Sequence, residues 1–343
     1  MRKKVLATLL ALGMAVTGTV VPCAASSSTA EAPGDQVNIS FLIKATDSDF
    51  WQQAVVGAKN FAFEHPDVNL TVQGPVSEAD TAEQTEILDN ILTTNPDGIA
   101  AAPTLEDNLS AGFDEAAKKN IPVAVFDNQP STENYISLFA TDTISAGKAV
   151  GEAFLKELDQ RGVEKKGVVG LISPMAGSLT VSRREEGFKE YLKDNAPDIK
   201  VLDPIYTDND IPKSLQAAED IYTANQDDLL GYFASNNATG DGLSQFMTEN
   251  DLGSKLVACA FDSDEAEINA VRDGQLFLTA VQNPYEMGYQ SVQCVYDVIK
   301  GTKKAADFEK FTDTGISLIT QENVDSDDMK GIIDPFSLKK YKD

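Results

Sequence analysis

The chain has 343 residues, of which 54 are Asp or Glu and 28 are Lys or Arg, so its formal net charge is −26. A surface this acidic repels nucleic acid and anionic lipid headgroups, and we therefore expect no nucleic-acid partner. Hydrophobic residues make up 42% of the chain, which is ordinary for a globular protein and excludes a disordered one. The length favours two domains.

The first residues have the pattern of an export signal. Residues 1–4 (Met-Arg-Lys-Lys) are positively charged, residues 5–21 are apolar apart from Gly and Thr, and small residues follow. This pattern predicts a signal peptide over residues 1–23 and a flexible linker over residues 24–36. Cys23 leaves two interpretations open. It is either the lipidated cysteine that tethers a lipoprotein to the outer face of the cytoplasmic membrane, or it lies beside an ordinary cleavage site that releases the chain into the periplasm.

Beyond residue 36, segments with the periodicity of strands alternate with segments that have the periodicity of helices. The predicted strands are 37–43, 68–72, one that starts at 98, 123–126, 135–139, 167–172, 201–206, 230–234, 256–261, 276–282 and 317–319. The predicted helices start at 50 and then span 80–94, 105–119, 145–160, 181–195, 212–224, 240–250, 263–273 and 287–300, before an irregular acidic tail. This alternation predicts an α/β fold with two doubly wound parallel-sheet lobes.

Two segments of the chain match each other in outline, and both end in Phe-Asp. They are residues 98–127 and 231–262. A strand that is apolar until it ends in Asp is typical of a buried parallel sheet that presents the carboxylate at its carboxyl edge. Ligands of open α/β sheets bind at that edge. The repeat therefore predicts two lobes whose polar edges face each other across a cleft.

The sequence argues against an enzyme and against a bound cofactor. It has no Gly-rich phosphate loop and no clustered His/Cys set, so we expect no cofactor and no metal. The only histidine, His65, precedes a proline, which leaves a catalytic triad without a base. Asp127 and Asp262 could form a glycosidase-like carboxylate pair, but amides and hydroxyls flank both. We therefore interpret them as hydrogen-bond acceptors.

The predicted strand tips and helix starts carry aromatic, carboxylate, amide, hydroxyl and guanidinium side chains. Aromatic rings stack on the C–H faces of sugars, Asp accepts hydrogen bonds from hydroxyls, Arg donates a rigid fork, and Asn or Gln does both. The set favours a neutral polyol ring over a phosphate or an amino acid. The candidate ligand-binding residues are Ser48, Phe50, Trp51, Asp127, Asn128, Thr141, Thr143, Arg184, Asn236, Asp262 and Gln282.

Six short motifs occur in an order and spacing that resemble a known family. They are Asp49-Phe50-Trp51 followed by Gly57-Ala58; residues 120–127 (Asn-Ile-Pro-Val-Ala-Val-Phe-Asp); residues 184–188 (Arg-Glu-Glu-Gly-Phe); Ala234-Ser235-Asn236; Ala260-Phe261-Asp262; and Gln282-Asn283-Pro284 followed by Gly288. Over residues 37–320 the chain resembles the ribose- and galactose-type periplasmic sugar-binding proteins, which are the type I solute receptors of bacterial ABC transporters.

The resemblance implies the type I periplasmic binding protein fold, a "Venus flytrap" of two lobes joined by three crossings. The crossings would fall near Asp142, Asn283 and Phe311. The N-terminal lobe would then comprise residues 37–141 plus 283–311, and the C-terminal lobe residues 142–282 plus 312–343. The resemblance also implies a monomer that closes over a monosaccharide.

Ligand-binding roles follow from the resemblance residue by residue. Trp51 would stack on the sugar beside Phe50, and Asp127 and Arg184 would bind hydroxyls together with Asn236, Asp262 and Gln282. The chain departs from the ribose-type pattern twice. Asn128 stands where those proteins have Arg, and Asn209 (or Tyr206, if the alignment slips) stands where they have an aromatic residue. Both departures argue against ribose itself.

The resemblance predicts an extracytoplasmic solute-binding protein that delivers a monosaccharide or similar polyol to the membrane permease of an ABC transporter. The ligand stays open among pentoses, hexoses, polyols and a quorum-signalling furanose. One alternative is a sensory receptor that feeds chemotaxis or a histidine kinase. Another is a non-DNA-binding relative of lactose-repressor-type regulators, which the export signal and the lack of DNA-binding helices disfavour.

Overall fold

The computed structural model describes residues 36–342. The predicted signal peptide, most of the predicted linker and Cys23 lie outside the described residues. Within residues 36–342, none of the helices combines the length and the apolar character that crossing a bilayer requires.

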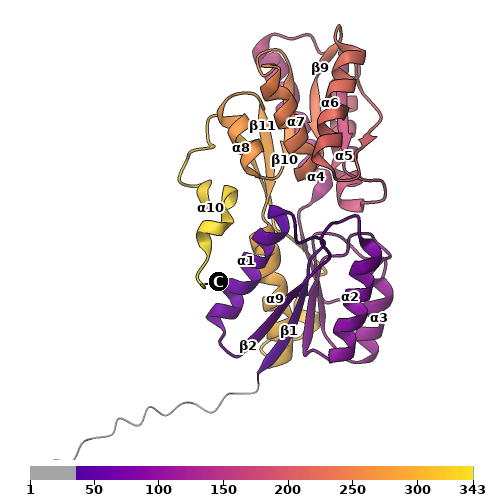
Figure 1. The fold of residues 1–343 in the computed structure, drawn as a ribbon, viewed down its shortest axis with the longest axis vertical. Coiled ribbons are helices and arrows are strands. Elements are labelled where there is room, and N and C mark those ends of the chain that lie inside the picture. The colour runs from indigo at the N-terminus through magenta and orange to yellow at the C-terminus, as the bar shows by residue number, and fades with distance from the viewer. Residues whose placement is uncertain (1–35, 343) are drawn as a thin grey trace, which may run out of the picture. The chain divides into compact units, whose positions relative to one another are not determined.

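The first sheet has six strands in the order β12-β5-β4-β3-β1-β2, and all of its pairings are parallel. Its strands are β1 (Val37–Leu42), β2 (Val68–Gln73), β3 (Gly98–Ala101), β4 (Val123–Phe126), β5 (Leu138–Ala140) and β12 (Phe311–Asp313). Its helices are α1 (Asp49–Glu64), α2 (Thr81–Thr94), α3 (Ser110–Lys118) and α9 (Pro284–Lys300). Helices α1 and α9 cover one face, and α2 and α3 cover the other (Figure 1).

Alternation along the central strands explains why both faces are covered. Successive strand residues point to opposite faces, so Ala100 packs with the α1/α9 layer whereas Ile99 and Ala101 pack with the α2/α3 layer. The close approach of α1 to α9 requires glycine. A Cβ on Gly288 would lie 2.0 Å from the backbone oxygen of Ala54.

The second sheet follows the order β13-β11-β10-β9-β6-β7, with β8 also paired to β6. Its strands are β6 (Gly167–Ser173), β7 (Ile199–Val201), β8 (Ile205–Tyr206), β9 (Leu229–Ala234), β10 (Val257–Phe261), β11 (Leu278–Gln282) and β13 (Ile316–Thr320). All pairings are parallel except that of β13, which runs antiparallel to β11. Helices α4 (Thr143–Arg161) and α5 (Leu179–Asn195) cover one face, and α6 (Ile211–Asn225), α7 (Asn237–Glu249) and α8 (Glu265–Arg272) cover the other.

The chain passes between the two sheets three times, after β5, after β11 and after β12. The predicted fold class, two doubly wound α/β lobes joined by three crossings, is confirmed. The third crossing lies slightly later than expected. Because β12 pairs with β5 in the first sheet, that crossing falls at residues 314–315, three residues after Phe311.

The expectation that residues 312–343 belong to the second lobe is wrong at its last residues. The predicted irregular tail contains α10 (Lys330–Ile333) and the short 3₁₀ helix η2 (Pro335–Leu338). From there the chain returns to α1, where Asn60 donates to the carbonyl of Leu338 over 2.8 Å and accepts from the backbone N–H of Lys340 over 2.9 Å. The yellow C-terminal segment lies beside α1 in Figure 1.

Three further expectations differ from the structure. The helix predicted from residue 105 begins at Ser110, because the Asn108 side chain accepts from the backbone N–H of Leu105 and holds a turn there. The strand predicted over 201–206 is divided into β7 and β8 around Pro204, which has no N–H to donate to a sheet. Finally, β12 was not predicted as a strand. Cys259 and Cys294 are buried and form no disulfide.

Candidate functional site

A cavity of about 40 Å³ lies where the carboxyl ends of strands from both sheets meet. Its lining includes eight of the residues that the sequence pointed to: Ser48, Phe50, Trp51, Asp127, Arg184, Asn236, Asp262 and Gln282. Strand tips of the two lobes thus form one cavity, as the internal repeat predicted.

The two Phe-Asp strand ends adopt the same local structure. Asp127 has φ 64° and Asp262 has φ 83°, a left-handed conformation that Asp tolerates better than most residues. In each case the Asp backbone N–H donates to a carbonyl of the next strand over 3.0 Å, that of Phe139 or that of Ala280. The turn at each Asp directs the chain off its sheet, and both Asp residues line the cavity.

In the first lobe, Asp127 forms a buried ion pair with Lys44. The Lys44 ammonium lies 2.5 Å from a carboxylate oxygen of Asp127, and both side chains are almost fully buried. The same ammonium lies 5.1 Å from the centre of the Trp51 ring. Lys44 was not among the candidate residues that the sequence indicated. Its position directly after a buried strand, where a long cationic side chain reaches the sheet edge, is the signal that would have found it.

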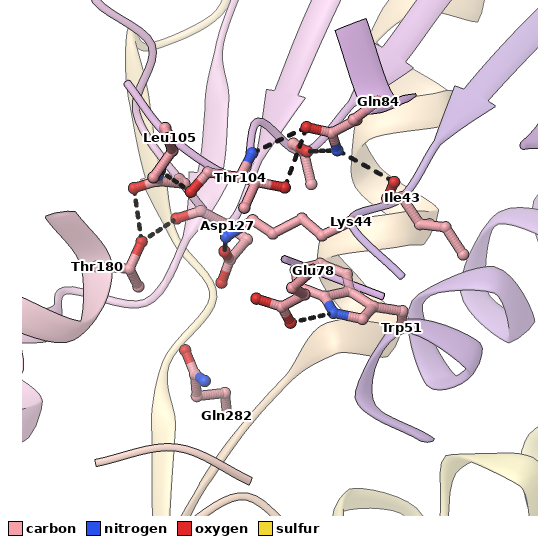
Figure 2. Close-up of polar contacts among 12 residues, drawn as sticks. Ile43, Lys44, Trp51, Glu78, Gln84, Thr104, Leu105, Asp127, Thr180 and Gln282 are labelled. Atoms are coloured by element: carbon pink, nitrogen blue, oxygen red, sulfur yellow. Dashed lines mark hydrogen bonds and ion pairs between the residues drawn. The ribbon is translucent and has the colours of Figure 1, made fainter. Parts of the chain in front are cut away.

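Glu78 is a second lining residue that the sequence analysis missed. The Trp51 indole donates to a Glu78 carboxylate oxygen over 2.6 Å (Figure 2). Burial raises the pKa of Glu78, an effect that the charge of Lys44 opposes. Glu78 precedes α2 in a loop that reaches the site because the backbone N–H of Thr46 donates to the carbonyl of Pro75. No local pattern marks this acid, because its approach depends on how two loops pair.

Gln84 of α2 fixes the ends of β1, which precedes Lys44, and of the neighbouring strand β3. Its buried amide donates to the carbonyls of Ile43 and Ala102, which follow neighbouring strands, over 3.1 Å and 2.8 Å. Its oxygen accepts from the backbone N–H of Thr104 over 3.1 Å. Figure 2 shows this network beside the Lys44 side chain. The first-lobe part of the site is therefore held by hydrogen bonds within its own lobe.

In the second lobe, Arg184 of α5 is only 2% exposed. One of its terminal nitrogens donates to the carbonyl of Ser235 over 2.8 Å, and its guanidinium carbon lies 4.0 Å from the centre of the Phe261 ring. Its Nε has no hydrogen-bond partner among the described residues. Burial lowers the pKa of Arg184, whereas the charge of Asp262 opposes that shift. Helix α5 can lie this close to α4 because Gly147 has no Cβ, which would lie 1.9 Å from the backbone oxygen of Arg184.

Gln282 and Asp262 complete the second-lobe wall. The Gln282 amide donates to an Asp262 oxygen over 3.0 Å, while the Gln282 amide oxygen is buried without a partner among the described residues. Burial raises the pKa of Asp262 to about 6, and Arg184 counteracts part of that rise. Arg184 thus has one donor, and Gln282 one acceptor, that no other described residue satisfies. Both residues line the cavity.

Four of the predicted residues do not line this cavity. Asn128 is buried beside it, donates to the carbonyl of Thr104 and accepts from the Thr180 hydroxyl over 2.8 Å. Thr141 and Thr143 line two other hollows near the first crossing. Asn209 lies behind Asn236, whose amide donates to it over 2.7 Å. Tyr206, the alternative to Asn209, is 51% exposed and is also outside the lining. For these residues, direct ligand contact stays a prediction.

The described residues contain no group of three or more His, Cys, Asp or Glu side chains arranged to hold a metal ion.

The fold and the two-lobed polar cavity define a class of binding protein, and comparison with known families agrees. Residues 39–303 match the family model "Periplasmic binding protein domain". The chain belongs to this family of periplasmic binding proteins. The match covers most of the residues that the structure describes, including every residue named above as lining the cavity.

Among relatives by sequence, a ribose import binding protein from Haemophilus influenzae is 26% identical over 294 residues, covering 85% of this chain and 94% of the relative. A D-allose-binding periplasmic protein from Escherichia coli is also 26% identical, with 84% of this chain and 91% of the relative covered. These relatives are similar to the chain over nearly their full length.

Solved structures give the same picture. A carbohydrate transporter solute-binding protein from Agrobacterium radiobacter, in complex with D-arabinose, matches with a TM-score of 0.82 and 29% identity, covering 87% of this chain and 99% of that one. An ABC transporter solute-binding protein from Agrobacterium vitis, with bound D-fucose, matches with a TM-score of 0.80 and 28% identity, covering 86% and 99%.

Proposed function

We propose that the protein is an extracytoplasmic solute-binding protein that captures a monosaccharide or similar polyol between its lobes and delivers it to an ABC transporter. One observation carries the proposal. The shared cavity is lined by three residues with buried side-chain atoms whose hydrogen bonds are unmet: the Nε donor of Arg184, the Nδ2 donor of Asn237 and the amide oxygen of Gln282. A hydroxyl group satisfies a donor or an acceptor, and a sugar ring presents several hydroxyls at once. The ligands of the similar solved proteins, arabinose and fucose, support the same class.

Each wall of the cavity has a role in this proposal. The Phe50 and Trp51 rings contact the C–H face of the sugar. Asp127 and Glu78 accept from hydroxyls on the first-lobe side, where Lys44 donates. Arg184, Asp262 and Gln282 bind hydroxyls from the second lobe. Because the cavity holds cations and carboxylates in similar number, it suits an uncharged ligand.

Capture requires the lobes to move. The cavity volume of about 40 Å³ is far below the roughly 300–1,000 Å³ typical of small-molecule sites, so a sugar enters only when the lobes are further apart. A ligand that contacts both lobes favours the closed state by the difference between its affinities for the two states. The hydrogen bond from Thr180 of α5 to Asn128, which follows β4, links the lobes directly in the state described.

The proposal includes release of the ligand without chemical change. It also includes export, docking of the closed form on a membrane permease, action as a monomer, and either soluble or Cys23-tethered forms outside the cytoplasm. Export and tethering rest on the sequence of residues 1–23.

A thermal-shift screen against monosaccharides and polyols tests the proposal. A ligand that binds only the folded state raises the melting temperature. At least one sugar should do so, and it should change the fluorescence of Trp51, the only tryptophan. Trp51→Ala should abolish the thermal shift. Trp51→Phe should retain part of it, because the ring face remains. No response across the whole panel would overturn the proposal, and an unchanged shift in Trp51→Ala would remove Trp51 from the site.

A further inference from the structure

A second and larger hollow, of about 380 Å³, lies beside the first crossing between the lobes. Gln129 and Tyr135 line it from the first lobe, Arg183 lines it from α5 of the second, and Phe311 lines it from the start of β12. None of these residues lines the sugar cavity. Its volume falls within the range of roughly 300–1,000 Å³ that small-molecule sites occupy.

A narrow hollow of about 30 Å³ shares wall residues with both spaces. Its wall includes Asp127 and Thr180, which also line the sugar cavity. The same wall includes Thr141, Arg183 and Phe311, which also line the larger hollow. The three hollows therefore lie next to one another along the carboxyl edge of β4 and β5. The hydrogen bond from Thr180 to Asn128 lies in the wall of the narrow part.

The larger hollow combines an exposed ring with an unused donor. Phe311 is 45% exposed, which is unusual for a large apolar side chain. The Arg183 guanidinium has no hydrogen-bond or ion-pair partner among the described residues. Lys310 is already committed, because it donates to the carbonyls of Glu133 and Tyr135 and lies 3.5 Å from the centre of the Tyr135 ring.

The charges around this hollow balance. Arg183 and Lys310 are cationic, and Glu133 and Asp142 are anionic. Asp142 is occupied in capping α4, where it accepts from the backbone and hydroxyl of Ser145. The exposed aromatic face can contact the C–H face of a sugar ring, and the free guanidinium can donate to its hydroxyls. Because the hollow carries no excess charge, it suits an uncharged ring, as the inner cavity does.

We propose that the ligand class extends to disaccharides, with one sugar ring in the inner cavity and the second in the outer hollow against Phe311 and Arg183. The narrow hollow between them then holds the glycosidic linkage, which is a single bridging oxygen and needs little width. This inference rests on the proposed function, because the inner ring occupies the monosaccharide site.

Isothermal titration calorimetry tests the inference on the mature chain. The first probe is the monosaccharide with the largest thermal shift in the screen, and the second is a panel of disaccharides that carry this sugar at one end. At least one disaccharide should bind about tenfold more tightly than the monosaccharide, which corresponds to one well-placed extra contact. Arg183→Ala and Phe311→Ala should each remove most of this gain and leave the affinity for the monosaccharide within about twofold.

Lys193→Ala is the matched control, because it removes an exposed cation from the same helix away from the three hollows. It should change neither affinity. If no disaccharide binds more tightly than the monosaccharide, or if Arg183→Ala and Phe311→Ala do not reduce the gain, the inference is overturned while the proposed function stands. If no monosaccharide binds either, the proposed function fails and the inference fails with it.

Discussion

The two halves of the site differ in how far their polar groups are satisfied by the protein itself. In the first lobe, Lys44 pairs with Asp127 and Trp51 donates to Glu78. In the second lobe, Arg184 and Gln282 each keep a buried atom without a partner. A buried polar group without a hydrogen bond destabilises a protein by roughly 1–3 kcal/mol, so the second-lobe half gains most when a ligand supplies the missing contacts. We infer that the first lobe orients the sugar and that the second lobe provides most of the free energy of closure.

Arg184→Met should have the largest effect on ligand binding and tests the difference between the two lobes most directly. It removes the unsatisfied donor and the charge that opposes the raised pKa of Asp262. We expect the affinity for the monosaccharide to fall about a hundredfold or more, equivalent to about 3 kcal/mol, because a charged hydrogen bond to the ligand is lost. Calorimetric titration measures this loss. The adjacent Arg183→Met is the control and should bind the monosaccharide normally. A loss below tenfold in Arg184→Met would contradict the assignment of closure energy to the second lobe.

Lys44→Met should act mainly on stability. It leaves the nearly buried Asp127 carboxylate without its cation, and breaking a buried ion pair on one side destabilises proteins by about 3–5 kcal/mol. Urea unfolding of the ligand-free protein measures the change in the free energy of unfolding. The double variant Lys44→Met/Asp127→Asn should recover part of the loss, because no unpaired charge remains. Equal losses in the single and double variants would mean that the two residues do not interact across this pair.

The fold could be predicted because its signals are local and repeated. Apolar strands ending in Asp127 and Asp262, with helices between strands, sufficed to predict two parallel-sheet lobes. The elements that were missed depend on distant parts of the chain. The strand β12 exists only because β5 lies beside it, and the final residues return to α1 through Asn60.

The candidate site could likewise be predicted only where its residues are marked by local sequence signals. Residues that immediately follow buried strands or begin helices, such as Asp262 and Trp51, were found and line the cavity. Glu78 was not found, because it reaches the indole through a loop whose path depends on backbone bonds to Thr46. Asn209 was placed by resemblance, but it does not line the cavity and instead accepts a hydrogen bond from the amide of Asn236, which does.

The smallest expected effect is on the pH dependence of stability. It concerns a cluster of carboxylates beside the second-lobe half of the site, namely Asp241, Asp264 and Glu267. Burial raises the pKa of Asp241 to about 8 from an ordinary 3.8, and also raises the pKa of Asp264 and Glu267. The neighbouring acids Asp262 and Asp49 of α1 act in the same direction on Asp241. By contrast, Lys300 holds the pKa of Asp67 in the first lobe below its usual value. The buried acids of the second lobe therefore make its stability depend on pH near neutrality. In the first lobe, a lysine instead stabilises the charged form of Asp67.

An acid whose pKa is raised by folding contributes stability that is fully present below its unfolded pKa and is lost as the pH rises through its folded pKa. For Asp241 this window runs from about pH 4 to about pH 8, so its contribution to stability should decrease across that range. Asp241→Asn mimics the protonated form and should escape the loss. We expect the variant to gain at least about 1 kcal/mol on the wild type in the free energy of unfolding as the pH rises from 5 to 8. Urea unfolding at both pH values measures this difference. Asp67→Asn, which loses an ion pair with Lys300, should lose the same stability at pH 5 and at pH 8, because the lowered pKa of Asp67 places its pH window below about pH 4. If the two variants respond to pH in the same direction, the two lobes do not differ in how they accommodate their acids.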